Sequence, residues 1–172
     1  MTKVANLERR RIQGEIVKPI YDELVAEIGK DAAQALLARA VRTSVRQEAK
    51  QAAAALGETG VSMEAFAASF RATYLDRGPE AGLDVELLRA DENHLDFNVT
   101  RCRFVEVYRE MGLGELAPVL SCNRDGAFAT DFDANIRLER AQTIAEGAPC
   151  CTFRYTYERS DTRGDGEGEN DG

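Results

Sequence analysis

The sequence predicts an α+β fold, in which N-terminal helices pack with a small antiparallel sheet and further short helices lie between the strands. Three observations support this. Apolar residues recur every three to four positions through residues 1–76, which is typical of helices. Alternating apolar residues in 83–90 and 94–99 flank a polar turn and indicate a β-hairpin. Helical and strand-like patterns then mix through residues 83–158.

Length and composition indicate one domain over residues 1–158, with a helical part (1–76) and a mixed part (83–158) that holds a cysteine site. Residues 159–172 form an acidic, apolar-poor tail that we expect to be disordered. The net charge of −8 argues against nucleic acid as a partner. A signal peptide and an apolar run long enough for a membrane are both missing from the sequence. We therefore expect a cytoplasmic protein with reduced thiols and a small-molecule partner, and the oligomeric state stays open.

The helical part contains apolar stripes at residues 4–16 and 20–28, with Pro19 marking a break or a first-turn position between them. An alanine-rich segment at residues 32–56, with Asp31 as its N-cap, predicts the longest helix.

Ser62 is expected to cap a third helix, whose large apolar residues recur at helical spacing. This spacing favours core packing over the lining of a ligand pocket. The residues concerned are Met63, Phe66, Phe70 and Tyr74.

In the mixed part, Thr100 is expected to cap a helix at residues 101–111, on which Cys102, Glu106 and Arg109 share a face. A short helix at 115–121 and a helical turn carrying Phe128 follow. Strands are expected from Ile136 to Arg140 and at 152–155. The only histidine, His94, lies at the hairpin turn, where an exposed bystander is more common than a general base.

All four cysteines, Cys102, Cys122, Cys150 and Cys151, lie within residues 98–155, and three interpretations remain open. Cys122 could be a nucleophile whose pKa is lowered by Arg124 and the following helical turn, with Asp125 as the general base. Alternatively, the thiolates could converge on a metal such as zinc, although their spacing is atypical of zinc sites. They could also be small buried apolar residues. We expect no cofactor, with a thiolate-bound zinc as the alternative.

Arginines are concentrated around these cysteines, and arginine is the natural bidentate partner of a carboxylate. Surface ion pairing with Glu139 and Glu146 is the competing explanation. The arginines concerned are Arg124, Arg137, Arg140 and Arg154.

Four motifs in this order resemble the L-2-amino-thiazoline-4-carboxylic acid hydrolase family. They are C-x-F-x-E-x-Y from Cys102, L-S-C-x-R-D from Leu120, R-x-Q-T-I from Arg140 and C-x-F-R-Y from Cys151. The resemblance covers residues 95–155 closely and the N-terminal helices loosely. It implies hydrolytic opening of a small cyclic amidine-like ring at a C–N bond, with a carbamoyl-cysteine type of product.

The family's cysteines match Cys102, Cys122 and Cys151, and its Arg-Asp pair matches Arg124 and Asp125. Its R-x-Q-T motif matches Arg140, Gln142 and Thr143, so the resemblance implies that Arg124 and these three residues bind substrate.

The sequence departs from the family pattern at two places. Cys150 and Thr152 stand where the family usually has histidine and aspartate, and Asp133-Ala134 replaces Asn-Pro. These departures leave two alternatives to a hydrolase: a non-catalytic small-ligand-binding domain that retains the pocket, and a thiolate metalloprotein.

Overall fold

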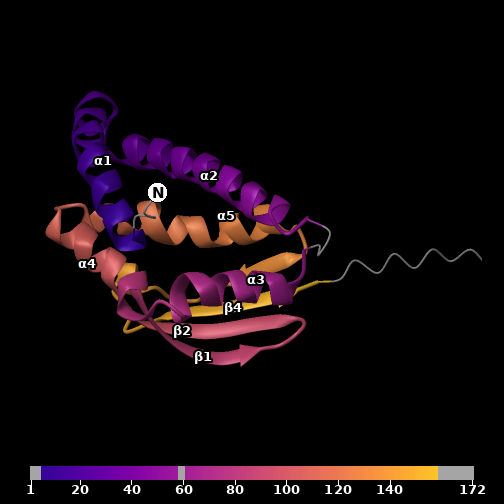
Figure 1. Cartoon of the computed structure of the whole chain (residues 1–172). Coiled ribbons are helices and arrows are strands. Elements are labelled where there is room, and N and C mark those ends of the chain that lie inside the picture. Colours follow the sequence, from indigo (N-terminus) through magenta and orange to yellow (C-terminus); the bar gives the residue numbers. More distant parts are fainter. Residues whose placement is uncertain (1–4, 58–60, 159–172) are drawn as a thin grey trace, which may run out of the picture.

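The computed structural model describes residues 5–57 and 61–158. In these residues a four-stranded antiparallel sheet has its helices gathered on one side (Figure 1), which confirms the α+β fold. The helices are α1 (Asn6–Ile28), α2 (Lys30–Ala54), α3 (Met63–Phe70), α4 (Arg103–Glu110) and α5 (Asn123–Phe132). The strands are β1 (Leu83–Ala90), β2 (His94–Cys102), β3 (Ile136–Glu139) and β4 (Cys151–Tyr157), in the order β1-β2-β4-β3. The acidic tail expected at 159–172 lies outside the described residues.

Helix α1 runs through Pro19 without interruption, so the predicted break is wrong. Proline removes one helical hydrogen bond, and the carbonyl left free belongs to Glu15, which is exposed and can bind water instead. The chain turns at Gly29, whose φ of 81° favours glycine, and α2 begins at once. Asp31 therefore lies in the first turn of α2, and the N-cap position belongs to Gly29.

Helix α3 begins as predicted, because the Ser62 side chain accepts a hydrogen bond from the Ala65 amide at 3.1 Å. The helix then continues as a π-helical turn, η2 (Arg71–Leu75), which carries Tyr74. A short 3-10 turn, η3 (Gly78–Ala81), leads into β1.

The predicted hairpin is β1 and β2, and β4 pairs with the other edge of β2. Alternate residues of β2 and β4 face the helices and lie opposite one another, as Phe97 does with Phe153 and Val99 with Cys151. The Phe97 and Phe153 rings stack at 4.7 Å between centroids, and Phe70 stacks on Phe97 at 4.3 Å. This aromatic layer joins the sheet to α3.

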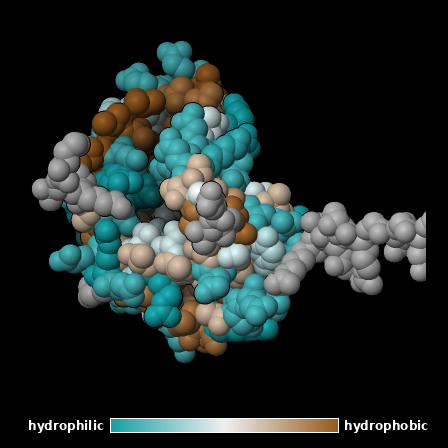
Figure 2. All heavy atoms as spheres, turned by 45° about the vertical axis from the view of Figure 1, so that its right-hand side comes forward, coloured by the Kyte–Doolittle hydropathy of each residue, from teal (hydrophilic) through white to brown (hydrophobic). Residues whose placement is uncertain are grey.

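Strand β1 is one of the two edges of the sheet, and its pairing with β2 shifts register twice, between Asp84 and Val85 and between Leu87 and Arg89. Such irregularities bend a strand and increase its twist. Figure 2 shows apolar side chains gathered over the upper part of the molecule and a smaller group at its lower edge.

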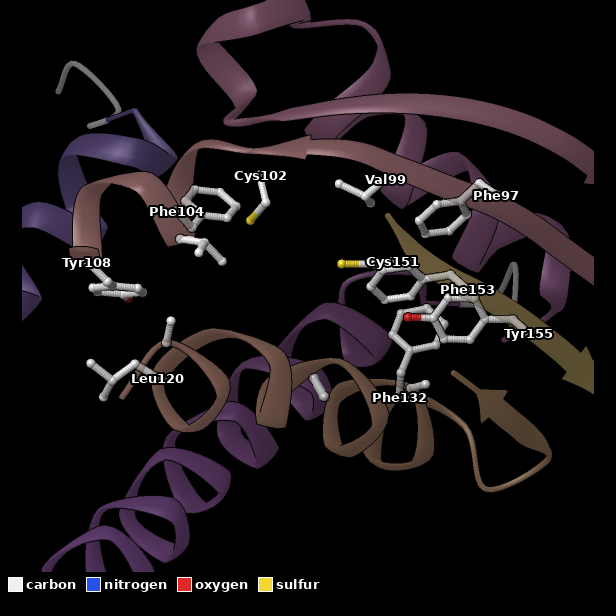
Figure 3. Packing of buried hydrophobic residues seen from close by; sticks show 14 of the residues in the cluster. Phe97, Val99, Cys102, Phe104, Tyr108, Leu120, Phe132, Cys151, Phe153 and Tyr155 are labelled. Carbon is white, nitrogen blue, oxygen red and sulfur yellow. The ribbon is translucent and has the colours of Figure 1, made fainter. Parts of the chain in front are cut away.

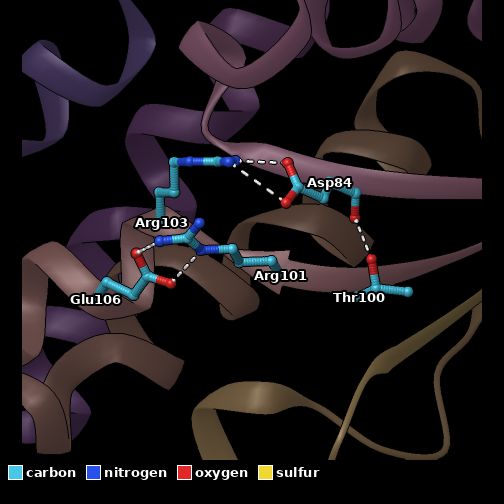
Figure 4. A network of polar contacts seen from close by, with 5 residues as sticks. All are labelled: Asp84, Thr100, Arg101, Arg103 and Glu106. Carbon is cyan, nitrogen blue, oxygen red and sulfur yellow. Dashed lines mark hydrogen bonds and ion pairs between the residues drawn. The ribbon is translucent and has the colours of Figure 1, made fainter.

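Helix α4 begins two residues later than predicted, and Thr100 belongs to β2. The Thr100 hydroxyl donates to the Asp84 carbonyl at 3.3 Å, so it ties two strands together and does not cap the helix. Figure 4 shows the surrounding polar network, in which Arg103 binds Asp84 and Arg101 binds Glu106.

We predict that Gly82→Ala destabilises the fold by about 3 kcal/mol, because a Cβ there would lie 2.6 Å from Cε1 of buried Phe104 while φ is +93°. Gly147→Ala is the matched control: its φ is +97°, but nothing lies within 4 Å of a Cβ, so only backbone strain of about 1 kcal/mol is expected. Urea denaturation of both variants measures the difference. Equal losses would show that the contact with Phe104 is unimportant.

Candidate functional site

A cavity of about 220 Å³ lies between the helix-facing side of the sheet and the helices. Its wall contains Cys102, Cys122, Cys151, Arg124 and Asp125, so the structure brings together five of the eight predicted site residues. They come from β2, β4 and α5, and from the π-helical turn η5 (Pro118–Cys122) before α5. The predicted short helix at 115–121 is this turn with a preceding 3-10 turn, η4 (Gly114–Leu116).

Each of the three cysteines reaches the cavity from the end of an element. Cys102 ends β2, Cys151 starts β4, and Cys122 ends η5 directly before α5. Figure 3 shows the sulfur atoms of Cys102 and Cys151 pointing into the same space between the sheet and the helices. Among residues 5–57 and 61–158, no three His, Cys, Asp or Glu side chains are grouped so as to hold a metal ion.

The thiols at the cavity are protonated at neutral pH. Burial, with the negative charge of Asp125 added, raises the pKa of Cys122 to about 12. Burial also raises the pKa of Cys102 to about 11 and raises that of Cys151. The expected lowering of the Cys122 pKa is therefore wrong, because desolvation of the thiolate outweighs the attraction of the nearby Arg140.

Asp125 and Arg140 form an ion pair at 2.5 Å, with 35% of the Asp125 side chain exposed and Arg140 largely buried. Burial raises the pKa of Asp125 to about 6, although the Arg140 guanidinium acts in the opposite direction. Arg140 also donates to the Cys122 carbonyl at 3.0 Å, and its guanidinium carbon lies 5.2 Å from the Phe153 ring centroid. Arg140 thus holds the start of α5 from behind the cavity wall.

Two further guanidinium groups, Arg124 and Arg10, line the cavity. Arg124 donates to Glu48 of α2 at 2.6 Å. Arg10 of α1 donates to Gln13, and none of the described carboxylates lies within ion-pair distance of it. Burial lowers the pKa of Arg124, and the nearby charge of Arg10 acts in the same direction, whereas Glu48 and Asp125 oppose the shift.

Sequence reasoning missed Arg10, although one signal could have found it. Arg10 shares a helical face with Gly14, Val17 and Tyr21, which pack inward, whereas its neighbour Arg11 pairs with Glu110 at the surface. The rest of the wall is aromatic, hydroxylated or aliphatic, and five of its residues come from α3 and η2, namely Phe66, Ser69, Phe70, Thr73 and Tyr74. The aromatic residues of α3 and η2 thus line the cavity, while Met63 is fully buried in the core.

Gln142 and Thr143 do not line the cavity. Gln142 donates to the Cys150 carbonyl at 3.0 Å, and the Thr143 hydroxyl donates to Glu146 at 2.6 Å. Thr143 also caps the 3-10 turn η6 (Ile144–Glu146), whose first amide lies 3.2 Å from the Cys151 sulfur. Both side chains thereby shape the segment that positions Cys151.

Two residues that depart from the family pattern, Cys150 and Thr152, also lie outside the cavity wall. Cys150 precedes β4, and its sulfur lies 3.3 Å from the Gln142 amide nitrogen. Thr152 alternates with Cys151 and Phe153, so it belongs to the sheet face turned away from the helices. Its buried hydroxyl has no hydrogen-bond partner among the residues that the structure describes. Neither Cys150 nor Thr152 therefore contributes a side chain to the cavity wall.

Three other polar residues singled out from the sequence lie elsewhere. His94 starts β2 and contacts Asp91, Glu106 pairs with Arg101, and Arg109 donates to the Ile144 carbonyl. The expected shared face of Cys102, Glu106 and Arg109 does not form, because Cys102 ends a strand before the helix starts.

The family model for L-2-amino-thiazoline-4-carboxylic acid hydrolase matches residues 9–155. No curated protein matches the chain by sequence. A solved structure, the phenol-responsive sensory domain of the transcription activator PoxR with phenol, is 19% identical with a TM-score of 0.51, covering 86% of this chain and 74% of that one. That likeness shows a shared fold.

Within the described residues, none of the helices combines the length and apolar character that a membrane span requires. The family match spans nearly all of the elements that form the cavity. The chain belongs to the L-2-amino-thiazoline-4-carboxylic acid hydrolase family.

Proposed function

We propose that this protein hydrolyses a small cyclic amidine-like compound that carries a carboxylate, opening the ring at a C–N bond. The observation that supports this most strongly is the meeting of Cys122, Asp125 and two arginines, Arg10 and Arg124, in one cavity. Its volume of about 220 Å³ equals roughly seven water molecules, which suits a single small ring.

The charges of the wall suit the two ends of such a substrate. Arg10 has no acidic partner among the described residues, so its guanidinium is available for a carboxylate. Arg124, already bound to Glu48, adds positive potential beside it. Asp125 can accept hydrogen bonds from the amidine nitrogens when it is ionised.

Cys122 is a better nucleophile in this cavity than water. The pKa of its thiol is about 12, whereas that of bulk water is near 16, so Asp125 removes the thiol proton at a smaller free-energy cost. An amidinium bound beside Cys122 would also stabilise the thiolate as it forms.

The reaction then has two stages. The Cys122 sulfur adds to the ring carbon as its proton passes to Asp125, and the ring nitrogen leaves with that proton, which opens the ring and gives a thioimidate on Cys122. Water next adds to the same carbon with Asp125 as base, and the Cys122 sulfur leaves and is reprotonated. The released product carries a carbonyl oxygen that comes from water.

The other predicted residues act around this centre. Arg140 keeps Asp125 and the Cys122 carbonyl in place, and the thiols of Cys102 and Cys151 pack beside the reacting group. Gln142 and Thr143 act indirectly, through the segment that leads to Cys151.

A second candidate function is ligand binding without turnover. The favouring observation is the similar fold of a sensory domain that its description calls phenol-responsive, together with the aromatic lining of this cavity. A binding domain would show thermal stabilisation by the cyclic compound with no opened product in mass spectrometry, whereas a hydrolase produces it.

Replacing Cys122 by Ser or Ala should lower kcat by about 10³-fold or more, because the nucleophile is lost while the fold remains. Cys150→Ser is the matched control and should retain activity, since Cys150 lies outside the cavity wall. Steady-state assays with L-2-amino-thiazoline-4-carboxylate measure both. If Cys122→Ala retains wild-type activity, water attacks directly and the covalent stage is wrong.

The pH dependence of kcat/KM should follow the ionisation of Asp125. Because the general base must be ionised and its pKa is raised to about 6, kcat/KM should rise with pH up to about 6 and level off above it. Asp125→Asn should abolish this rise together with activity. Asp131→Asn, a surface aspartate of the same helix that pairs with Arg46, should leave the profile unchanged. A midpoint near 4 in the wild type would exclude Asp125 as the base.

Arg10→Gln should raise KM about tenfold or more with little change in kcat, because the contact with the substrate carboxylate is the same in the ground and transition states. Arg11→Gln, which removes the adjacent surface arginine, should leave KM unchanged. A substrate amide lacking the carboxylate charge should bind equally weakly to the wild type and to the Arg10 variant. Unequal weakening would place the carboxylate elsewhere.

A further inference from the structure

Helix α1 exposes a row of isoleucines that the rest of the described chain, residues 29–57 and 61–158, does not cover. Ile12, Ile16 and Ile20 recur every four residues. The exposed fraction of the surface is 61% for Ile16 and 49% for Ile20. Figure 2 shows apolar side chains gathered over the upper part of the molecule, where α1 and the start of α2 lie in Figure 1. A contiguous apolar row on a helix is typical of a surface that packs against another helix.

A shallow apolar groove continues this row toward the end of α1. It is lined by Pro19, Ile20, Glu23, Leu24 and Glu27. One helix thus carries both the projecting isoleucines and an apolar groove. A surface with both features is self-complementary, which is the requirement for a two-fold symmetric interface.

The charges along α1 set the direction of such pairing. On the face that carries the isoleucines, Arg9 lies at the N-terminal end of α1, and Glu23 and Glu27 lie at its C-terminal end. Antiparallel pairing places Arg9 against the acidic end of a second copy and opposes the two helix dipoles, whereas parallel pairing places like charges together. The same acidic end disfavours a surface of anionic lipids.

We propose that the exposed row of α1 is a homodimer interface, in which two copies of α1 pack antiparallel. In this arrangement Ile16 of each copy lies opposite Ile20 of the other, and Ile12 faces the groove at Leu24. Arg9 approaches the acidic end of the partner helix near its Glu27. The cavity remains accessible, because Arg10 and Gly14 lie on the opposite, inward face of α1.

Sedimentation equilibrium of the full chain tests the proposal. The wild type should sediment as a dimer of the 18.9-kDa chain at micromolar concentration. Ile16→Arg should give the monomer mass with unchanged circular dichroism, since an exposed residue contributes little to the monomer fold. A monomeric wild type at tens of micromolar would overturn the proposal.

Leu88→Arg is the matched control, because Leu88 of β1 is also 49% exposed but lies at the sheet edge. This variant should remain a dimer, and loss of the dimer here with retention in Ile16→Arg would move the interface to the sheet edge. Arg9→Glu should weaken the dimer about tenfold, and adding Glu27→Arg should restore it. Weakening without restoration would contradict the antiparallel orientation.

Discussion

Asp125, in the wall of the cavity, forms an ion pair with Arg140, which lies behind that wall. This pair holds the start of α5, next to Cys122. A carboxylate taken out of water must be compensated by a charge and by hydrogen bonds, and Arg140 supplies both from the end of β3. The same guanidinium binds the Cys122 carbonyl and covers the Phe153 ring. One side chain therefore connects α5, the turn before it and β4, the three elements that carry Cys122, Asp125 and Cys151.

The protonation of the groups at the cavity follows from this arrangement. Burial keeps its thiols protonated, and protonated thiols are slow to oxidise and slow to react with small electrophiles. Beside these thiols lie Asp125, whose pKa is raised to about 6, and Arg10, which has no acidic partner among residues 5–57 and 61–158. The proposed substrate carries opposite charges at its two ends, which match these two groups.

Much of this could be predicted from the sequence, because local patterns determine local structure. The α3 cap at Ser62 and the β1–β2 hairpin followed from spacing, whereas a shared site for Cys102, Cys122 and Cys151 was implied by the family resemblance and remained one of three interpretations of these cysteines. The continuity of α1 through Pro19 could not be predicted, since it depends on that side of the helix facing water. Arg10 was also missed, because its role depends on how α1 is rotated against the sheet, a property of tertiary packing. The expected lowering of the Cys122 pKa failed for the same reason: burial is a property of the whole fold.

The two register shifts of β1 bear on how the molecule behaves at high concentration. An outer strand with free amides and carbonyls, and with Leu87 and Leu88 exposed, could recruit strands from other molecules and seed fibrils. Because the shifts interrupt the regular spacing of those groups and twist the strand, an incoming segment finds only a few consecutive partners. The irregular pairing of β1 thus disfavours the addition of strands from other molecules at this edge.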